Sequence, residues 1–190
     1  MSTLVVVRKD EYAAIASDTL TTFGDRRLSA AYNKKAHKIV KFGHSHIGVV
    51  GSAAHLMVIE SVLQEFSDLT LATTIEIYEF LRTLHPILKE KYFLNPKEDE
   101  SDPYESTQIN ALLINQHGIF GIYSLREVYE YNTFWAIGSG AEFALGAMFA
   151  IYDQLKSAEE IAKLGVRAGC EFDCKSSPPI RAHSVKLKVD

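Results

Sequence analysis

Cysteine, proline and long apolar runs are all scarce in this 190-residue sequence. Its two cysteines are too few for the disulfide framework that stabilises small secreted domains. The longest nearly apolar stretch, residues 143–152, is far shorter than the roughly 18 to 20 residues that span a bilayer. The first residues also lack the apolar segment and the small-residue cleavage site of a secretory signal. We therefore expect a cytoplasmic protein that does not associate with membranes.

The sequence also has no excess of basic residues. The 20 Lys and Arg residues are outnumbered by 24 Asp and Glu residues, which gives a formal net charge of -4. A protein that binds the nucleic-acid backbone needs a clustered basic surface. Nucleic acid is therefore not expected as a partner.

The residues that bind metals do not form a recognisable set. Cys170 and Cys174 are spaced to share a helix face, but no neighbouring ligands complete a zinc site around them. The seven histidines are scattered, and the rings of His44 and His46 are expected at a solvated strand edge. We predict two reduced thiols, no metal and no cofactor.

The chain has no Gly/Ser/Pro-rich linker, so residues 1–190 are expected to form one domain. Apolar patterns with the period of strands and helices follow one another along the chain. Ser or Thr followed three residues later by Glu, at Thr73 and Ser157, predicts the start of two helices. The expected strands are 4–7, 12–16, 40–51, 108–116, 118–123, 127–131, 134–137 and 180–189, and the expected helices are 53–66, 73–88, 141–155 and 158–171.

This order of elements predicts the fold class. Strands, two helices, strands, two helices and a final strand are typical of an α+β domain in which helices cover antiparallel sheets. We expect a four-layer αββα sandwich with two antiparallel sheets between two helix pairs. Residues 127–131 and 134–137 are expected to continue one meander, and the acidic stretch 94–107 is expected to be an exposed loop.

The residue after Met1 is Ser2, whose small side chain favours removal of the initiator methionine. Removal would leave a first residue that carries both a hydroxyl and a free α-amine. Such an amine has a pKa of about 7.7 to 8.0, so near neutral pH it can accept the proton of the hydroxyl. One residue would then supply both the nucleophile and the base, although many cytosolic proteins begin in the same way.

Several further polar and glycine positions follow Ser2 at characteristic spacings: Asp18, the segment Lys35-Ala-His-Lys-Ile, Gly51-Ser-Ala-Ala, Gly138-Ser-Gly, and Asp173-Cys-Lys-Ser. In this order they resemble the β-type subunits of the proteasome and the HslV peptidase, which are N-terminal nucleophile hydrolases. The resemblance extends from Ser2 to about Leu187 and points to a bacterial proteasome homologue.

The resemblance implies a role for each of these positions. Ser2 takes the place of the family's nucleophile, which is usually threonine, and Asp18 that of the aspartate orienting the catalytic lysine. The lysine falls on Lys35, although an ungapped count would choose Lys34. Gly51 supplies the N–H that receives the oxyanion.

The remaining implied residues support the amine and the substrate. Ser139, Asp173 and Ser176 match the family's polar group near the free amine, although the usual following glycine is Ser177 here. The residues expected to border the substrate pocket are His37, Val49 and Ala53.

The resemblance also implies an activity and an assembly. Members hydrolyse peptide bonds inside homo-oligomeric stacked rings, often with an ATPase unfoldase that delivers unfolded protein. The alternatives are a catalytically inactive ring subunit that serves as scaffold or binding chamber, and an amidase of the same class that acts on a small molecule.

Overall fold

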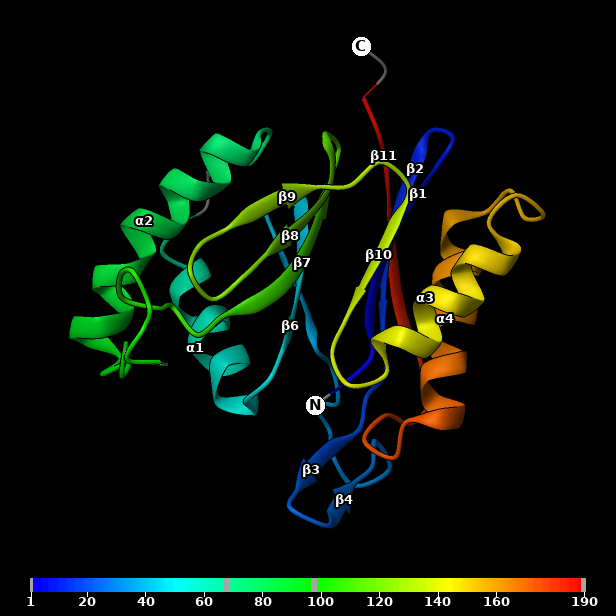
Figure 1. Cartoon of the computed structure of the whole chain (residues 1–190), viewed down its shortest axis with the longest axis horizontal. Coiled ribbons are helices and arrows are strands. Elements are labelled where there is room, and N and C mark those ends of the chain that lie inside the picture. Colours follow the sequence, from blue (N-terminus) through cyan, green and yellow to red (C-terminus); the bar gives the residue numbers. More distant parts are fainter. Residues whose placement is uncertain (1, 67–68, 97–98, 189–190) are drawn as a thin grey trace.

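The computed structural model describes residues 2–66, 69–96 and 99–188. Two antiparallel sheets face each other, and a helix pair covers the outer face of each (Figure 1). The first sheet has the order β10-β1-β2-β11, and the second has the order β5-β6-β7-β8-β9. A separate two-stranded hairpin, β3-β4, projects from one end (Figure 1). The strands are β1 (Leu4–Lys9), β2 (Tyr12–Ser17), β3 (Thr21–Phe23), β4 (Arg26–Leu28), β5 (Ile39–Phe42), β6 (Ser45–Val50), β7 (Asn110–Asn115), β8 (Gly118–Ile122), β9 (Val128–Glu130), β10 (Phe134–Ile137) and β11 (Arg181–Lys186).

Side-chain caps define where three of the four helices begin. The hydroxyl oxygens of Ser52, Thr73 and Ser157 accept hydrogen bonds from backbone N–H groups in the first turns of their helices. The second and third of these caps are the ones that the sequence predicts. The helices are α1 (Ala53–Leu63), α2 (Thr74–Lys91), α3 (Ala141–Ile151) and α4 (Ala158–Phe172). None of the helices in the described ranges is long and apolar enough to cross a membrane.

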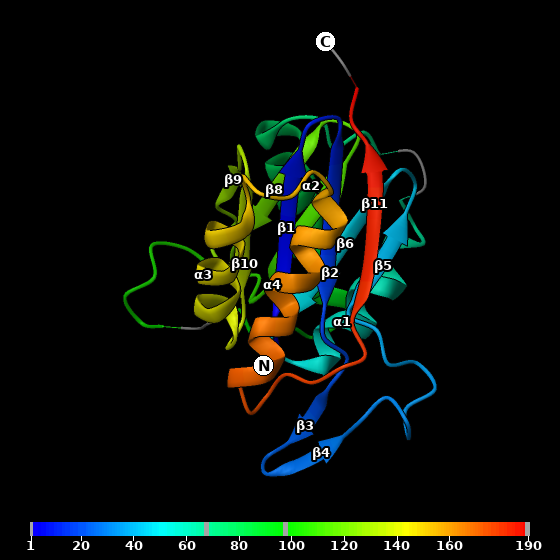
Figure 2. The ribbon, with the colours of Figure 1, turned by 90° about the vertical axis from the view of Figure 1, so that its right-hand side faces the viewer.

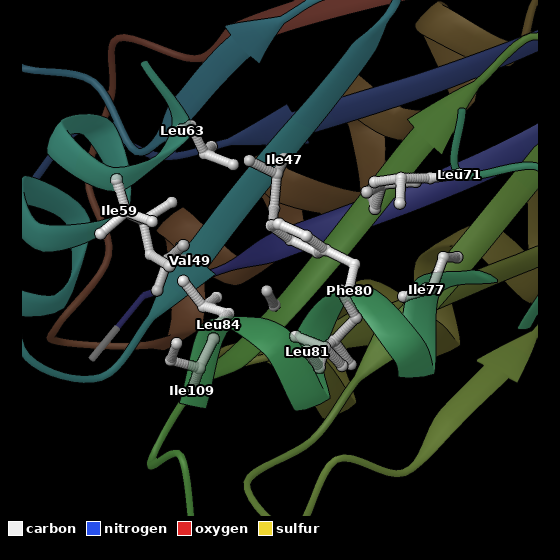
Figure 3. Packing of buried hydrophobic residues seen from close by; sticks show 14 of the residues in the cluster. Ile47, Val49, Ile59, Leu63, Leu71, Ile77, Phe80, Leu81, Leu84 and Ile109 are labelled. Atoms are coloured by element: carbon white, nitrogen blue, oxygen red, sulfur yellow. The ribbon is translucent and has the colours of Figure 1, made fainter. Parts of the chain in front are cut away.

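Three apolar clusters hold the four layers together. Large side chains such as Ile59, Phe80 and Leu84 join α1 and α2 to the β5–β9 sheet (Figure 3). A second cluster lies between the sheets. The third joins α3 and α4 to the other sheet and contains mostly small residues, among them Ala144 and Ala162; α4 crosses the face of β1, β2 and β11 (Figure 2). The predicted αββα sandwich is confirmed.

Two strand predictions are wrong in their detail. Residues 40–51 form a hairpin of β5 and β6 rather than one strand, because Gly43 and His44 make a turn. Strand β10 leaves the predicted meander and pairs with β1 in the other sheet, where Ile137 lies opposite Leu4. The crossing brings Gly138 and the start of α3 beside the first residues of the chain.

Two further differences concern the ends of elements and one histidine. The last strand spans Arg181–Lys186 rather than 180–189, and Val189 lies outside the described residues. His46 is buried and stacks on His183 across the two sheets, so the expected solvated strand edge is wrong for this residue. His44 is exposed in the β5–β6 turn.

Candidate active site

Asp18 is a fully buried carboxylate at the end of β2. Its Oδ1 accepts hydrogen bonds from the Thr3 backbone N–H at 3.1 Å and from Lys38 Nζ at 2.6 Å. Its Oδ2 accepts from the backbone N–H groups of Leu20 at 2.9 Å and Ser177 at 3.2 Å. Four donors, three of them from distant parts of the chain, therefore converge on one carboxylate, as a buried charge requires. We call Thr3, Asp18, Leu20, Lys38 and Ser177 the Asp18 cluster.

The lysine beside Asp18 is Lys38, and the predicted placement of Lys35 there is wrong. Lys34 and Lys35 are exposed in a turn, in which the Lys35 N–H donates to Asn33 Oδ1. Lys38 lies immediately before β5, so the buried start of that strand at Ile39 fixes its position next to Asp18. The β3–β4 hairpin and the turn after it lengthen the connection, which makes a count from Ser2 unreliable. The missed signal is a lysine that directly precedes the apolar pair Ile39-Val40.

Burial also affects the pKa of this lysine. Burial lowers the pKa of Lys38 below its usual value, and the charge and hydrogen bond of Asp18 oppose that shift. Only 12% of its side chain is exposed, whereas that of Asp18 is not exposed at all. The ammonium is therefore held at a fixed place in a poorly hydrated environment, where it acts strongly on a nearby developing charge.

Ser2 is buried at the start of β1, and two glycines fix its backbone. The Gly140 N–H donates to the Ser2 carbonyl oxygen at 3.3 Å. A Cβ on Gly138 would lie 2.1 Å from that same oxygen, so only glycine permits the approach. Met1 lies outside the described residues.

Ser2 lines a pocket of about 80 Å³, the Ser2 pocket, together with Lys38 and Gly51. Gly51 has a φ of +106°, and no atom lies within 4 Å of the place that its Cβ would occupy. The space where a side chain would lie is therefore open at this glycine, and a carbonyl could approach its backbone closely. The pocket also contains the three residues expected to border substrate, His37, Val49 and Ala53, and five that the sequence analysis does not single out, Leu20, Thr21, Thr22, Ser52 and Leu56.

The predicted group of Ser139, Asp173 and Ser176 is also brought together. The hydroxyls of Ser139 and Ser176 both donate to Asp173 Oδ2, at 2.7 and 2.6 Å. The Ser176 hydroxyl also lies 2.7 Å from Thr3 Oγ1, so the group contacts the chain one residue after Ser2. Burial raises the pKa of Asp173, but the hydrogen bonds from Ser139 and Ser176, together with the backbone N–H and the charge of Lys175, hold the pKa below its usual value. Asp173 is therefore an anion at neutral pH.

The two cysteines are free, and neither forms part of a metal site in the described residues. Within residues 2–66, 69–96 and 99–188, no three His, Cys, Asp or Glu side chains converge as metal ligands would. Burial, with the negative charge of Asp18, raises the pKa of the Cys170 thiol to about 12. Cys170 is therefore protonated at neutral pH and is not a thiolate nucleophile.

Comparison with known proteins identifies the family. Residues 1–177 match the family described as proteasome subunit. The chain belongs to the proteasome subunit family. Two solved structures of BPH from Thiobacillus denitrificans resemble this proteasome subunit along almost its whole length. One is 37% identical with a TM-score of 0.92, and covers 99% of this chain and 100% of that chain. The other structure, in complex with epoxomicin, is 36% identical with a TM-score of 0.91. The match covers 98% of this chain and 100% of the Thiobacillus denitrificans chain.

A more distant relative shares the fold of this proteasome subunit. The eukaryotic HslV from Trypanosoma brucei is 22% identical with a TM-score of 0.69, over 97% of this chain and 99% of that chain. The predicted resemblance to proteasome β-type subunits and HslV is thus confirmed, and so is the fold that it implies.

Proposed function

We propose that this chain, as one proteasome β-type domain over residues 1–190, is the subunit of a self-compartmentalising peptidase. Ser2, freed by removal of Met1, would be its nucleophile. The observation that carries the proposal is that Ser2, Lys38 and Gly51 line one pocket while Lys38 is paired with Asp18 at 2.6 Å. A nucleophile, a cation and a backbone N–H that can receive an oxyanion are three groups that promote acyl transfer.

The chemistry follows from these groups. The α-amine of Ser2 takes the proton of the Ser2 hydroxyl, and the oxygen attacks the carbonyl carbon of the peptide bond. The Lys38 ammonium stabilises the negative charge that develops on the nucleophile. The Gly51 N–H donates to the oxyanion, a contact whose loss typically costs about 10²- to 10³-fold in rate.

Collapse of the tetrahedral intermediate breaks the C–N bond. The protonated α-amine returns its proton to the leaving amine, and the acyl group stays on Ser2 as an ester. Water, deprotonated by the same amine, then hydrolyses the ester and regenerates Ser2. Because serine lacks the methyl group that restricts χ1 of threonine, more of its rotamers are unproductive, and turnover should be slower than with threonine.

The outer faces of the helices support an assembly of copies of this chain. Phe143, Phe149 and Phe172 on α3 and α4 are exposed by 42%, 80% and 69%, and the rings of Phe143 and Phe172 lie 5.5 Å apart. Exposed apolar side chains that adjoin in this way are typical of a protein–protein contact surface. We propose homo-oligomeric stacked rings in the cytoplasm that enclose the Ser2 pockets, with peptide or unfolded protein as substrate and an ATPase unfoldase as partner.

Mass spectrometry with epoxomicin tests the proposal, because the relative from Thiobacillus denitrificans was solved in complex with this compound. The purified protein is expected to lack Met1 and to gain the mass of epoxomicin on Ser2, and the Ser2→Ala variant to gain nothing. A retained Met1 with no adduct would contradict the proposal and support an inactive ring subunit. Hydrolysis of simple amides but not of fluorogenic peptides would instead indicate an amidase.

A further inference from the structure

One wall of the Ser2 pocket is formed by an imidazole that is held from outside the pocket. His37 lines the pocket, and its Nε2 lies 2.6 Å from Glu60 Oε1 on α1. Glu60 does not line the Ser2 pocket. It lines a second hollow of about 630 Å³, the outer pocket, between β5 and the later turns of α1. The pair therefore lies where the two pockets adjoin.

The two pockets differ in size and lining. The Ser2 pocket lies against the first turn of α1, at Ala53 and Leu56. The outer pocket is much larger, and its lining combines apolar side chains from Phe42, Leu63 and Phe66 with the polar side chains of Lys41 and Gln64. A side chain that extended past His37 would enter this outer pocket.

We propose that the His37–Glu60 pair is a partition that limits the length of the substrate side chain entering the Ser2 pocket, and so determines specificity. This inference rests on the proposed function. The chain then selects short or medium uncharged side chains before the scissile bond, because the imidazole closes the pocket and Glu60 fixes the imidazole. The adjacent Lys38 ammonium disfavours basic side chains at the same place.

The bond to Glu60 matters because His37 is not fixed by burial. Its side chain is 36% exposed, and that of Glu60 is 30% exposed. A half-exposed imidazole has several rotamers, and a short hydrogen bond to a carboxylate selects one of them. Removal of Glu60 should therefore weaken the partition, and removal of the imidazole should open it.

The experiment measures kcat/KM for fluorogenic peptides that differ only in the residue before the leaving group, either alanine or phenylalanine. In the His37→Ala variant, the kcat/KM for the phenylalanine substrate relative to that for the alanine substrate is expected to rise about tenfold or more, since a single methylene group in an apolar pocket is worth roughly 10- to 200-fold. Glu60→Ala should raise the ratio in the same direction by a smaller factor. The ratio cancels any loss of activity common to both substrates.

His44→Ala is the matched control, because His44 is exposed in the β5–β6 turn and lines neither pocket, and its ratio should equal that of the wild type. An active wild type with unchanged ratios in both His37→Ala and Glu60→Ala would overturn the partition and leave the proposed function standing. If His37→Ala does not fold, Glu60→Ala decides by the same criterion. A wild type that neither turns over the peptides nor binds epoxomicin would instead remove the proposed function, and the partition with it.

Discussion

Two groups of ionisable side chains, each with a buried member, show opposite behaviour in this molecule. In the Asp18 cluster, one carboxylate accepts four hydrogen bonds and is paired with a lysine. In the histidine stack, the rings of His46 on β6 and His183 on β11 lie 4.7 Å apart across the two sheets. His46 Nδ1 is buried there without a hydrogen-bond partner. The first group concentrates charge, whereas the second excludes it.

The difference shows how this interior accommodates ionisable groups. A charge survives burial where donors converge on it, and a group without such donors becomes neutral instead. Burial, assisted by His183 and Lys41, lowers the pKa of His46 to about 4. The pKa of His183 is lowered too, mainly by burial and against the opposing charge of Glu159, while Arg181 and Lys41 lower it further. The charged pair of Asp18 and Lys38 thus lies at the Ser2 end of the sandwich, whereas the imidazole rings of the stack are neutral at neutral pH.

The largest expected effect follows from removal of the Lys38 ammonium from the Asp18 cluster. Lys38→Ala is expected to lower kcat/KM for a peptide substrate by about 10³-fold or more, because the nucleophile and Asp18 both lose their cation. Lys35→Ala should remain within about twofold of the wild type, since Lys35 is exposed in a turn. A large loss in Lys35→Ala with little loss in Lys38→Ala would show that the lysine is wrongly assigned.

Lowering the pH should destabilise the fold through the histidine stack. The native pKa of His46 is about 4 and its ordinary value 6.5, so between these values the unfolded chain binds a proton that the folded chain does not. The free energy of unfolding should therefore fall as the pH is lowered from 6.5 to about 4, by up to about 3 kcal/mol. His46→Phe keeps an aromatic ring but cannot titrate, so its urea-unfolding midpoints should depend less on pH.

His44→Ala serves as the control for this measurement, because it removes an exposed histidine and should keep the wild-type pH dependence. If the urea-unfolding midpoints of the wild type and of His46→Phe change with pH to the same extent, the stack is already hydrated in solution.

The smallest effect concerns the backbone beside the Asp18 cluster. A Cβ on Gly169 of α4 would lie 2.3 Å from Thr3 Oγ1 and 2.6 Å from Thr3 Cγ2. Gly169→Ala should therefore destabilise the fold by about 1 to 3 kcal/mol. Gly146→Ala on α3 meets no atom within 4 Å and should stabilise by about 0.5 to 1 kcal/mol. Thermal unfolding distinguishes the two, and a matching shift for both would indicate that Thr3 moves aside freely.

The layers could be predicted from the sequence because each depends on a local pattern. Apolar residues at helical spacing, with caps at Thr73 and Ser157, define two helices without reference to any distant contact. The destination of β10 could not be predicted in this way. Its side chains suit either sheet, and pairing with β1 is decided by where the rest of the chain leaves an unpaired edge.

The site was predictable in part for a similar reason. Ser2 and Asp18 lie at the two ends of the β1–β2 hairpin, whose strands pair in a regular register, so Asp18 returns to the start of the chain and accepts from the Thr3 N–H. Lys38 comes after an irregular connection whose length no periodic pattern fixes. His46 was placed wrongly because alternation along β6 does not reveal that both faces of this strand are covered.

The hydrogen bond from Gly140 to the Ser2 carbonyl oxygen has a consequence for the removal of Met1. Gly140 and the β1–β10 pairing locate Ser2 through atoms that lie on its C-terminal side, so nothing upstream is needed to position it. Because Ser2 is buried in the folded chain, removal of Met1 is expected before folding, and the contacts that locate Ser2 can then form without it.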